Sequence, residues 1–242
     1  MQLLKRQTHI DFLGQRRYAV ILSLILIVAS LASLAVQGLK LGIDFTGGTL
    51  IEVGYQEPVD LVPVRDALTA AEFPDAQVQH FGTARELLVR IAPREGINSA
   101  TISTQILSAL EGSPGAAGVE MRRVEFVGPQ VGDELTEQGG LAILYALAGI
   151  LAYVAFRFEY RFAAGSVAAL AHDVIITLGF FSLFQVEFDL TVLAALLAVI
   201  GYSLNDTIVV FDRIRENFRV MRKGSTLEVM NRSINQTLSR TL

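Results

Sequence analysis

Two carboxylates and one guanidinium lie within or beside long apolar stretches, where charged groups are costly. Asp173 and Asp206 each interrupt such a stretch, and Arg240 lies near the end of a polar segment. An ionisable group inside a membrane span costs at least about 2.5–3.5 kcal/mol, so such residues normally face protein and often mark a path for protons or ions. These residue types therefore predict reversible protonation inside a membrane.

Asp206 has hydroxyl and amide neighbours that could hold water beside a buried carboxylate. These neighbours are Ser203, Asn205 and Thr207. A carboxylate in this setting can load and release a proton, because water and hydroxyl groups can pass the proton on. We favour this proton-relay role for Asp206 over a purely structural one.

Asp173 follows His172 and shares a helix face with Gly165 and Ala169, four and eight residues before it. Small residues at this spacing allow close helix packing, so Asp173 is expected to face a neighbouring helix. Two interpretations stay open. Asp173 can make a hydrogen-bonded packing contact, or it can take a direct part in proton movement with His172 in support.

Arg240 lies at the end of a predicted helix. Ser225 and Glu228 form a capping-box pattern, and no Gly or Pro occurs in residues 226–242. If this helix starts a fifth span that runs outward, Arg240 reaches a depth near that of Asp206, and the two form a switchable ion pair. The alternative is an arginine at the membrane surface.

Four apolar stretches are long enough to position these residues inside a bilayer. The chain of 242 residues is 52% hydrophobic and 18% charged, with a mean hydropathy of +0.46. A bilayer core needs about 20 apolar residues in helical form. The predicted organisation is an N-terminal segment 1–17, spans 18–36, 135–156, 162–184 and 190–211, an insert 37–134, a loop 212–232 and the start of a fifth span 233–242.

Basic residues predict the orientation, since Lys and Arg are retained in the cytoplasm. They precede the first span, lie between the second and third, and follow the fourth, whereas the insert holds 14 acidic against 7 basic residues. The N-terminus is therefore expected to be cytoplasmic and the insert to lie outside. A cleaved signal peptide is the alternative for span 18–36, but its uncharged stretch exceeds a typical signal-peptide core.

The insert changes periodicity and predicts a small folded domain. Strands are expected at 49–55, 77–81, 86–92 and 119–127, with helices capped by Asp60 and Asn98. This order matches the βαββαβ arrangement of ferredoxin-like domains, so the fold class is an α-helical polytopic membrane protein with an inserted α+β domain. That fold hosts many functions and names none.

Several function classes are disfavoured by composition. The chain has no Cys, and its three His residues are too far apart to form a helical metal pair. Its net charge of −4 is not typical of a nucleic-acid-binding protein. We find neither a phosphate-binding loop nor a nucleophile elbow, so we expect no enzyme, no cofactor and no bound metal.

Five segments carry a resemblance to a known family and spread over nearly the whole chain: 42–49, 127–132, 171–173, 201–217 and 233–241. They resemble the SecF proteins of the bacterial SecD/SecF family, which belongs to the resistance-nodulation-division (RND) superfamily. The resemblance implies a partnership with SecD, the SecYEG channel and YajC in the inner membrane. It further implies that the proton motive force helps to move a translocating polypeptide, with Asp206 and Arg240 as relay residues.

The resemblance leaves two questions open. It implies two further spans beyond Leu242, so we expect the sequence to be a truncated piece of a longer protein. A scaffold subunit that does not conduct protons, and a subunit of another RND transporter, remain as alternative functions. The small insert disfavours a drug or lipid pump, because such pumps usually carry larger exported domains.

Overall fold

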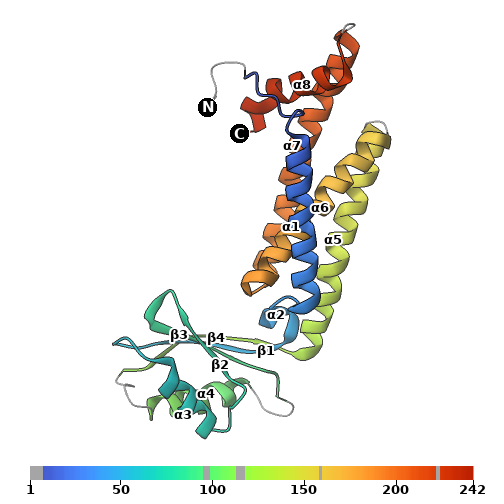
Figure 1. Cartoon of the computed structure of the whole chain (residues 1–242). Coiled ribbons are helices and arrows are strands. Elements are labelled where there is room, and N and C mark those ends of the chain that lie inside the picture. The colour runs from blue at the N-terminus through green and yellow to red at the C-terminus, as the bar shows by residue number, and fades with distance from the viewer. Residues whose placement is uncertain (1–7, 95–98, 113–117, 158–159, 222–223, 242) are drawn as a thin grey trace. The chain divides into compact units, whose positions relative to one another are not determined.

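The computed structural model describes residues 8–94, 99–112, 118–157, 160–221 and 224–241. These residues form two compact units, one of residues 41–140 and one that combines residues 1–40 with 141–242. Figure 1 shows a sheet with helices in the first unit and long helices in the second. The predicted fold class, a helical membrane protein with an inserted α+β domain, is confirmed.

The unit of residues 41–140 contains a four-stranded antiparallel sheet in the order β2-β3-β1-β4. Two helices lie against it (Figure 1). The elements are β1 (Gly48–Gly54), α3 (Leu61–Ala70), β2 (Gln77–Phe81), β3 (Thr83–Ile91), α4 (Ser99–Glu111) and β4 (Glu120–Val127). This succession and strand order are those of the ferredoxin-like fold that the sequence predicts.

The core of this unit follows from the alternation of apolar residues. Ile51 and Val53 of β1 are buried against the apolar stripes of α3 and α4. The Asp60 side chain caps α3 by accepting a hydrogen bond from Val62 N at 3.2 Å, as predicted. Asn98, the predicted cap of α4, lies outside the described residues. Burial raises the pKa of Tyr55 in this core to about 12.

A short helix that the sequence does not predict, α2 (Ile43–Thr46), precedes β1 and ends at a pair of glycines. Gly48 has φ +124°, and a Cβ there would lie 2.4 Å from the Ile91 carbonyl oxygen, so glycine is required. Arg90 donates hydrogen bonds of 2.7 Å to Leu41 O and Thr46 Oγ1. Strand β3 therefore holds α2 against the end of the sheet.

Four helices are long and apolar enough to cross a membrane: α1 (Arg16–Val36), α5 (Pro129–Arg157), α6 (Tyr160–Phe184) and α7 (Leu190–Val220). The helices extend past the predicted spans, since α5 begins before residue 135 and α7 continues after residue 211. The reason is that polar helix formers without Gly or Pro follow the apolar part of α7. The predicted loop 212–232 is thus largely helical, and α8 (Thr226–Thr241) begins within it.

Helices α1 and α6 meet through small residues. The hydroxyls of Ser33 and Ser182 lie 2.8 Å apart in a buried hydrogen bond. A Cβ built on Gly179 would lie 2.6 Å from Ser30 Cα, so the two backbones approach too closely for a side chain at this position. Small residues at a helix contact allow this close approach. The resulting van der Waals contacts stabilise the helix pair in lipid, where the hydrophobic effect does not drive helix association.

We expect Gly179→Ala to lower the thermal stability of the detergent-solubilised chain, because the added methyl group overlaps Ser30. Overpacking of this kind costs about 1–3 kcal/mol. Gly149→Ala is the matched control, since a Cβ at Gly149 meets nothing within 4 Å. Equal melting temperatures for the two variants would show that the close α1–α6 contact does not stabilise the bundle.

Candidate functional site

Asp173 lies on α6 with its carboxylate held by two side chains. Ser203 Oγ, from the neighbouring helix α7, donates a hydrogen bond of 2.6 Å to Asp173 Oδ2. His172 Nδ1 lies 2.9 Å from Asp173 Oδ1. The carboxylate therefore faces α7, as the small-residue face of α6 predicts, and links two of the apolar helices.

His172 adds a second titratable group to this contact. Its Nε2 atom is buried and has no hydrogen-bond partner among the residues that the structure describes. The tautomer of the imidazole decides which of its two nitrogens donates a hydrogen bond and which accepts one. The trio of Asp173, His172 and Ser203 is the polar cluster between α6 and α7.

Asp206 has a different environment. It lies one turn after Ser203 on α7 and is exposed in this chain, together with Asn205 and with Tyr202, which is 76% exposed. Thr207 Oγ1 donates to Ser203 O at 3.0 Å, within the same helix. In the described part of the chain, no hydrogen bond or ion pair joins the Asp206 side chain to another residue.

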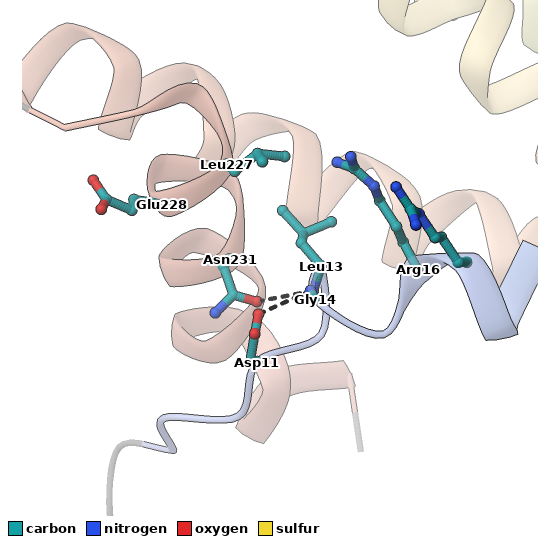
Figure 2. Close-up of a pocket in the computed structure, with 8 residues that line it drawn as sticks. Asp11, Leu13, Gly14, Arg16, Leu227, Glu228 and Asn231 are labelled. Atoms are coloured by element: carbon teal, nitrogen blue, oxygen red, sulfur yellow. Dashed lines mark hydrogen bonds between the residues drawn. The ribbon is translucent and has the colours of Figure 1, made fainter.

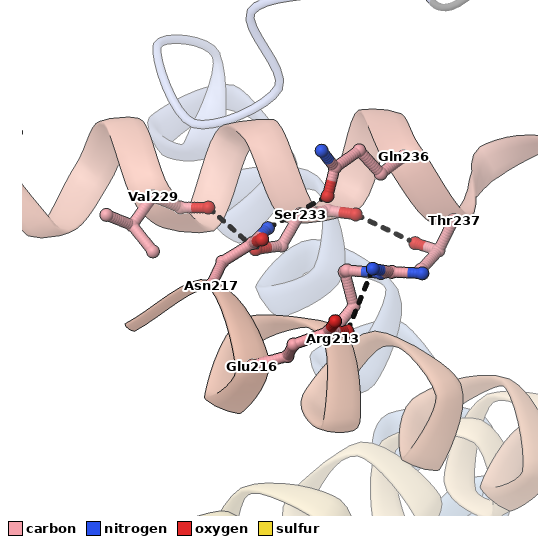
Figure 3. Close-up of polar contacts among 7 residues, drawn as sticks. All are labelled: Arg213, Glu216, Asn217, Val229, Ser233, Gln236 and Thr237. Carbon is pink, nitrogen blue, oxygen red and sulfur yellow. Dashed lines mark hydrogen bonds and ion pairs between the residues drawn. The ribbon is translucent and has the colours of Figure 1, made fainter. Parts of the chain in front are cut away.

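Helix α8, which carries Arg240, is attached to α7 by a buried amide. Asn217 Nδ2 donates hydrogen bonds of 2.9 Å to both Ser233 Oγ and Gln236 Oε1 (Figure 3). The reciprocal capping box between Ser225 and Glu228 begins α8 as predicted. Figure 1 shows α8 lying across the end of α7.

Arg240 is exposed in the last turn of α8, and the described residues include no ion pair between it and Asp206. The structure thus brings Asp173, His172 and Ser203 together but does not join Asp206 to Arg240. That pair stays a prediction. No three His, Cys, Asp or Glu side chains gather as metal ligands in the described ranges.

Two features of this region are not predicted by the sequence. The sequence places Ser203 beside Asp206 on one helix, whereas in the structure its hydroxyl donates a hydrogen bond to Asp173, thirty residues away. Asn217 was not singled out, although it is buried between α7 and α8. A single amide within the charged end of α7 gives no periodic signal in the sequence. Its burial is evident only where α7 and α8 cross in the structure.

Two family models match the chain. The SecD/SecF C-terminal model of protein-export membrane proteins covers residues 110–242, and the SecD/SecF GG motif covers residues 32–59. Protein translocase subunit SecF of Vibrio alginolyticus is 58% identical over 241 residues, and that of Pseudomonas aeruginosa is 53% identical over 233 residues. The chain belongs to the SecD/SecF family of protein-export membrane proteins.

Within this SecD/SecF family, the alignment covers 100% of this chain and 76% of the Vibrio SecF, and 96% of this chain and 75% of the Pseudomonas SecF. A crystal structure of SecDF from Thermus thermophilus, described as a translocon-associated membrane protein, matches with a TM-score of 0.84 at 37% identity. That match covers 100% of this chain and 32% of the SecDF chain. Gly47 and Gly48, where α2 ends and β1 begins, are the adjacent glycines within the residues that this motif matches.

We expect Ser203→Ala to destabilise the α6–α7 contact of this SecD/SecF member. The variant leaves Asp173 without its donor from α7, and a lost hydrogen bond to a carboxyl group costs about 1–3 kcal/mol. Thr207→Val is the control, since it removes a hydroxyl that bonds only backbone of its own helix in the described structure. Thermal unfolding in detergent measures both. Equal shifts would contradict a special role for the Ser203 hydroxyl.

Proposed function

We propose that this chain acts as a SecF subunit that uses the proton motive force to assist SecYEG-dependent export of polypeptides. On this proposal it pairs with SecD in the bacterial inner membrane, contacts SecYEG, with YajC as a further partner, and keeps its N-terminus in the cytoplasm. It works as a transport subunit, without an enzymatic activity or a cofactor of its own. Protons are the coupling species.

The observation that carries the proposal is the exposed polar face of α7 formed by Tyr202, Asn205 and Asp206. This face lies inside the apolar part of a helix long enough to span a membrane. A charged side chain facing lipid there costs about 2.5–3.5 kcal/mol or more, so polar groups at this depth face protein or water. The exposed polar face therefore indicates a contact with a helix of another protein. We take SecD, from the same family, to be that partner.

The proposed mechanism places Asp206 and Arg240 in a pair that protonation weakens. Neutralising the carboxylate removes its attraction for the guanidinium, which frees α8 to shift against α7. Formation of the pair requires α8 to bring Arg240 closer to Asp206 than it lies in this structure. Asp173, held by Ser203 and His172, is a second site where a proton can reside, between α6 and α7.

The available energy bears on the number of protons. Moving one charge through 100 mV is worth about 2.3 kcal/mol, which biases a two-state equilibrium by less than a hundredfold. Complete switching between two states takes about 5.5 kcal/mol. We therefore expect each cycle to use more than one proton.

The distribution of basic residues supports the proposed orientation. Arg16 and Arg17 begin α1, Arg157 ends α5, and Arg213 and Arg219 occupy the last part of α7. The start of α1 and the end of α7 lie at the same end of the bundle (Figure 1). Because Lys and Arg are retained in the cytoplasm, this end is the cytoplasmic one on our proposal.

Asp206→Asn in the complete, assembled protein is expected to abolish the proton-dependent part of polypeptide export into inverted membrane vesicles. The amide keeps the size of the side chain but can no longer gain or lose the proton. Glu216→Gln is the control, because Glu216 lies on the same helix in an exposed ion pair with Arg213, 2.8 Å apart, and such pairs contribute little.

Undiminished proton-dependent export in Asp206→Asn would remove Asp206 from the mechanism. If Ser203→Ala and Arg240→Gln were equally silent while SecD still co-purified with the chain, the scaffold function would be favoured instead. Loss in Glu216→Gln as severe as in Asp206→Asn would show that any charge change on α7 disrupts the protein.

A further inference from the structure

Residues 8–14, which we call the strap, run along α8 before α1 begins. They form no helix or strand, and they lie in the same compact unit as α8. Figure 2 shows part of the strap beside α8, with Asn231 pointing at its backbone. Backbone groups outside helices and strands need other hydrogen-bond partners, and here two amide side chains of α8 supply them.

Asn235 binds both polar groups of one strap residue. Its Oδ1 accepts a hydrogen bond from Ile10 N at 2.8 Å, and its Nδ2 donates to Ile10 O at 2.8 Å. Nδ2 also donates to Asn231 O at 2.9 Å, so both of its hydrogens are used. The amide fixes Ile10 and is itself oriented by the helix that carries it.

Asn231, one turn earlier on α8, binds the next strap residues. Its Oδ1 accepts hydrogen bonds from Phe12 N at 2.9 Å and Leu13 N at 3.3 Å. Its Nδ2 donates to Ile10 O at 3.1 Å. The two asparagines thus make five hydrogen bonds to the strap backbone, and none of the five depends on the identity of a strap side chain.

The asparagine pair lies on the face of α8 opposite the one that meets α7. At 100° per residue, Asn231 and Asn235 lie on one side, whereas Ser233, which bonds Asn217, lies on the other. Arg240 follows Ser233 by seven residues and so shares the face of Ser233. Helix α8 is held from both sides, and its rotation about its own axis sets the direction of Arg240.

We propose that Asn231 and Asn235 are positioning residues for Arg240, and that the strap fixes the rotation of α8. The proposal rests on the proposed function in one respect, the role of Arg240 in proton coupling. The strap leads directly into α1, and α1 packs on α6 through the Ser33–Ser182 contact. The hydrogen bonds from Asn231 and Asn235 to the strap therefore attach α8 to the membrane bundle independently of Asn217. Without these hydrogen bonds, α8 is attached only to α7 and can rotate about its own axis.

A cross-linking experiment tests whether Asn231 and Asn235 hold the strap against α8. These 242 residues contain no cysteine, so Thr8→Cys with Arg232→Cys creates a single Cys pair within them, and both positions line one cavity of about 320 Å³ between the strap and α8. A short bis-maleimide should join them efficiently in membranes. Adding Asn231→Ala and Asn235→Ala should reduce the cross-linked fraction at least about fivefold, the factor for one lost hydrogen bond.

A transport experiment tests positioning in the complete, assembled protein. Asn231→Ala with Asn235→Ala should lower the proton-dependent part of export at least about fivefold, and leave the gradient-independent part and the amount of assembled complex unchanged. Asn231→Asp should restore most of the loss, since a carboxylate still accepts from Phe12 N and Leu13 N. Arg232→Gln, an exposed change on α8, is the control.

Each outcome decides the proposal. An unchanged cross-linked fraction in the double alanine variant would overturn it, because the amides would then not hold α8. Loss of the cross-link with unchanged proton-dependent export, or with an equal loss of gradient-independent export, would overturn the positioning role. Failure of the proposed function is recognised separately, since Asp206→Asn would then be silent while the cross-link still responds to the asparagines.

Discussion

Polar groups inside a bilayer must find partners on other helices, and this requirement governs the helical unit. Ser33 of α1 meets Ser182 of α6, and Asp173 of α6 meets Ser203 of α7. Each pair joins two helices in a bilayer, where the hydrophobic effect does not favour helix–helix contact over helix–lipid contact, because hydrocarbon tails are as apolar as leucine. Polar and small residues thus join α1 to α6 and contribute to the contact of α6 with α7, where the rings of Phe162 and Phe211 also meet, with centroids 4.9 Å apart. The large apolar side chains mostly face outward.

Asp206 departs from this rule within the described chain. Its face on α7 is exposed, whereas Asp173, on the neighbouring helix, is bonded from two sides. Asp173 therefore belongs to a contact within this chain, and on our proposal Asp206 belongs to a surface that meets another protein. A protonation event at Asp206 would then be felt at an interface between subunits, where a small shift of α7 or α8 can be passed on.

The sequence was sufficient for the fold because the fold depends on strong periodic signals. Four apolar stretches, the strand alternation of Ile51 and Val53, and the Asp60 cap are local patterns, and each has its predicted place. Helix α2 was not predicted because four residues before a glycine pair carry no periodicity. Helix α7 continues past the predicted span 190–211 because hydropathy marks where lipid ends, whereas helix propensity decides where the helix ends.

The candidate site was only partly predictable for a related reason. Burial cost singles out Asp173 and Asp206 individually, but it does not say which side chain of another helix each one meets. The Ser203 hydroxyl and the amides of Asn217, Asn231 and Asn235 act across helix crossings, and no spacing along the chain encodes those contacts. The strap of residues 8–14 is the extreme case, since it is bound through its backbone.

The central claim is that the polar face of α7 meets protein and not lipid. Photo-cross-linking from Tyr202, replaced by p-benzoyl-phenylalanine in the complete protein in native membranes, tests it most directly, because Tyr202 is 76% exposed one turn before Asp206. If this face meets protein, cross-linking yields a discrete protein adduct that contains SecD or another membrane subunit. Adducts with lipid alone would contradict it.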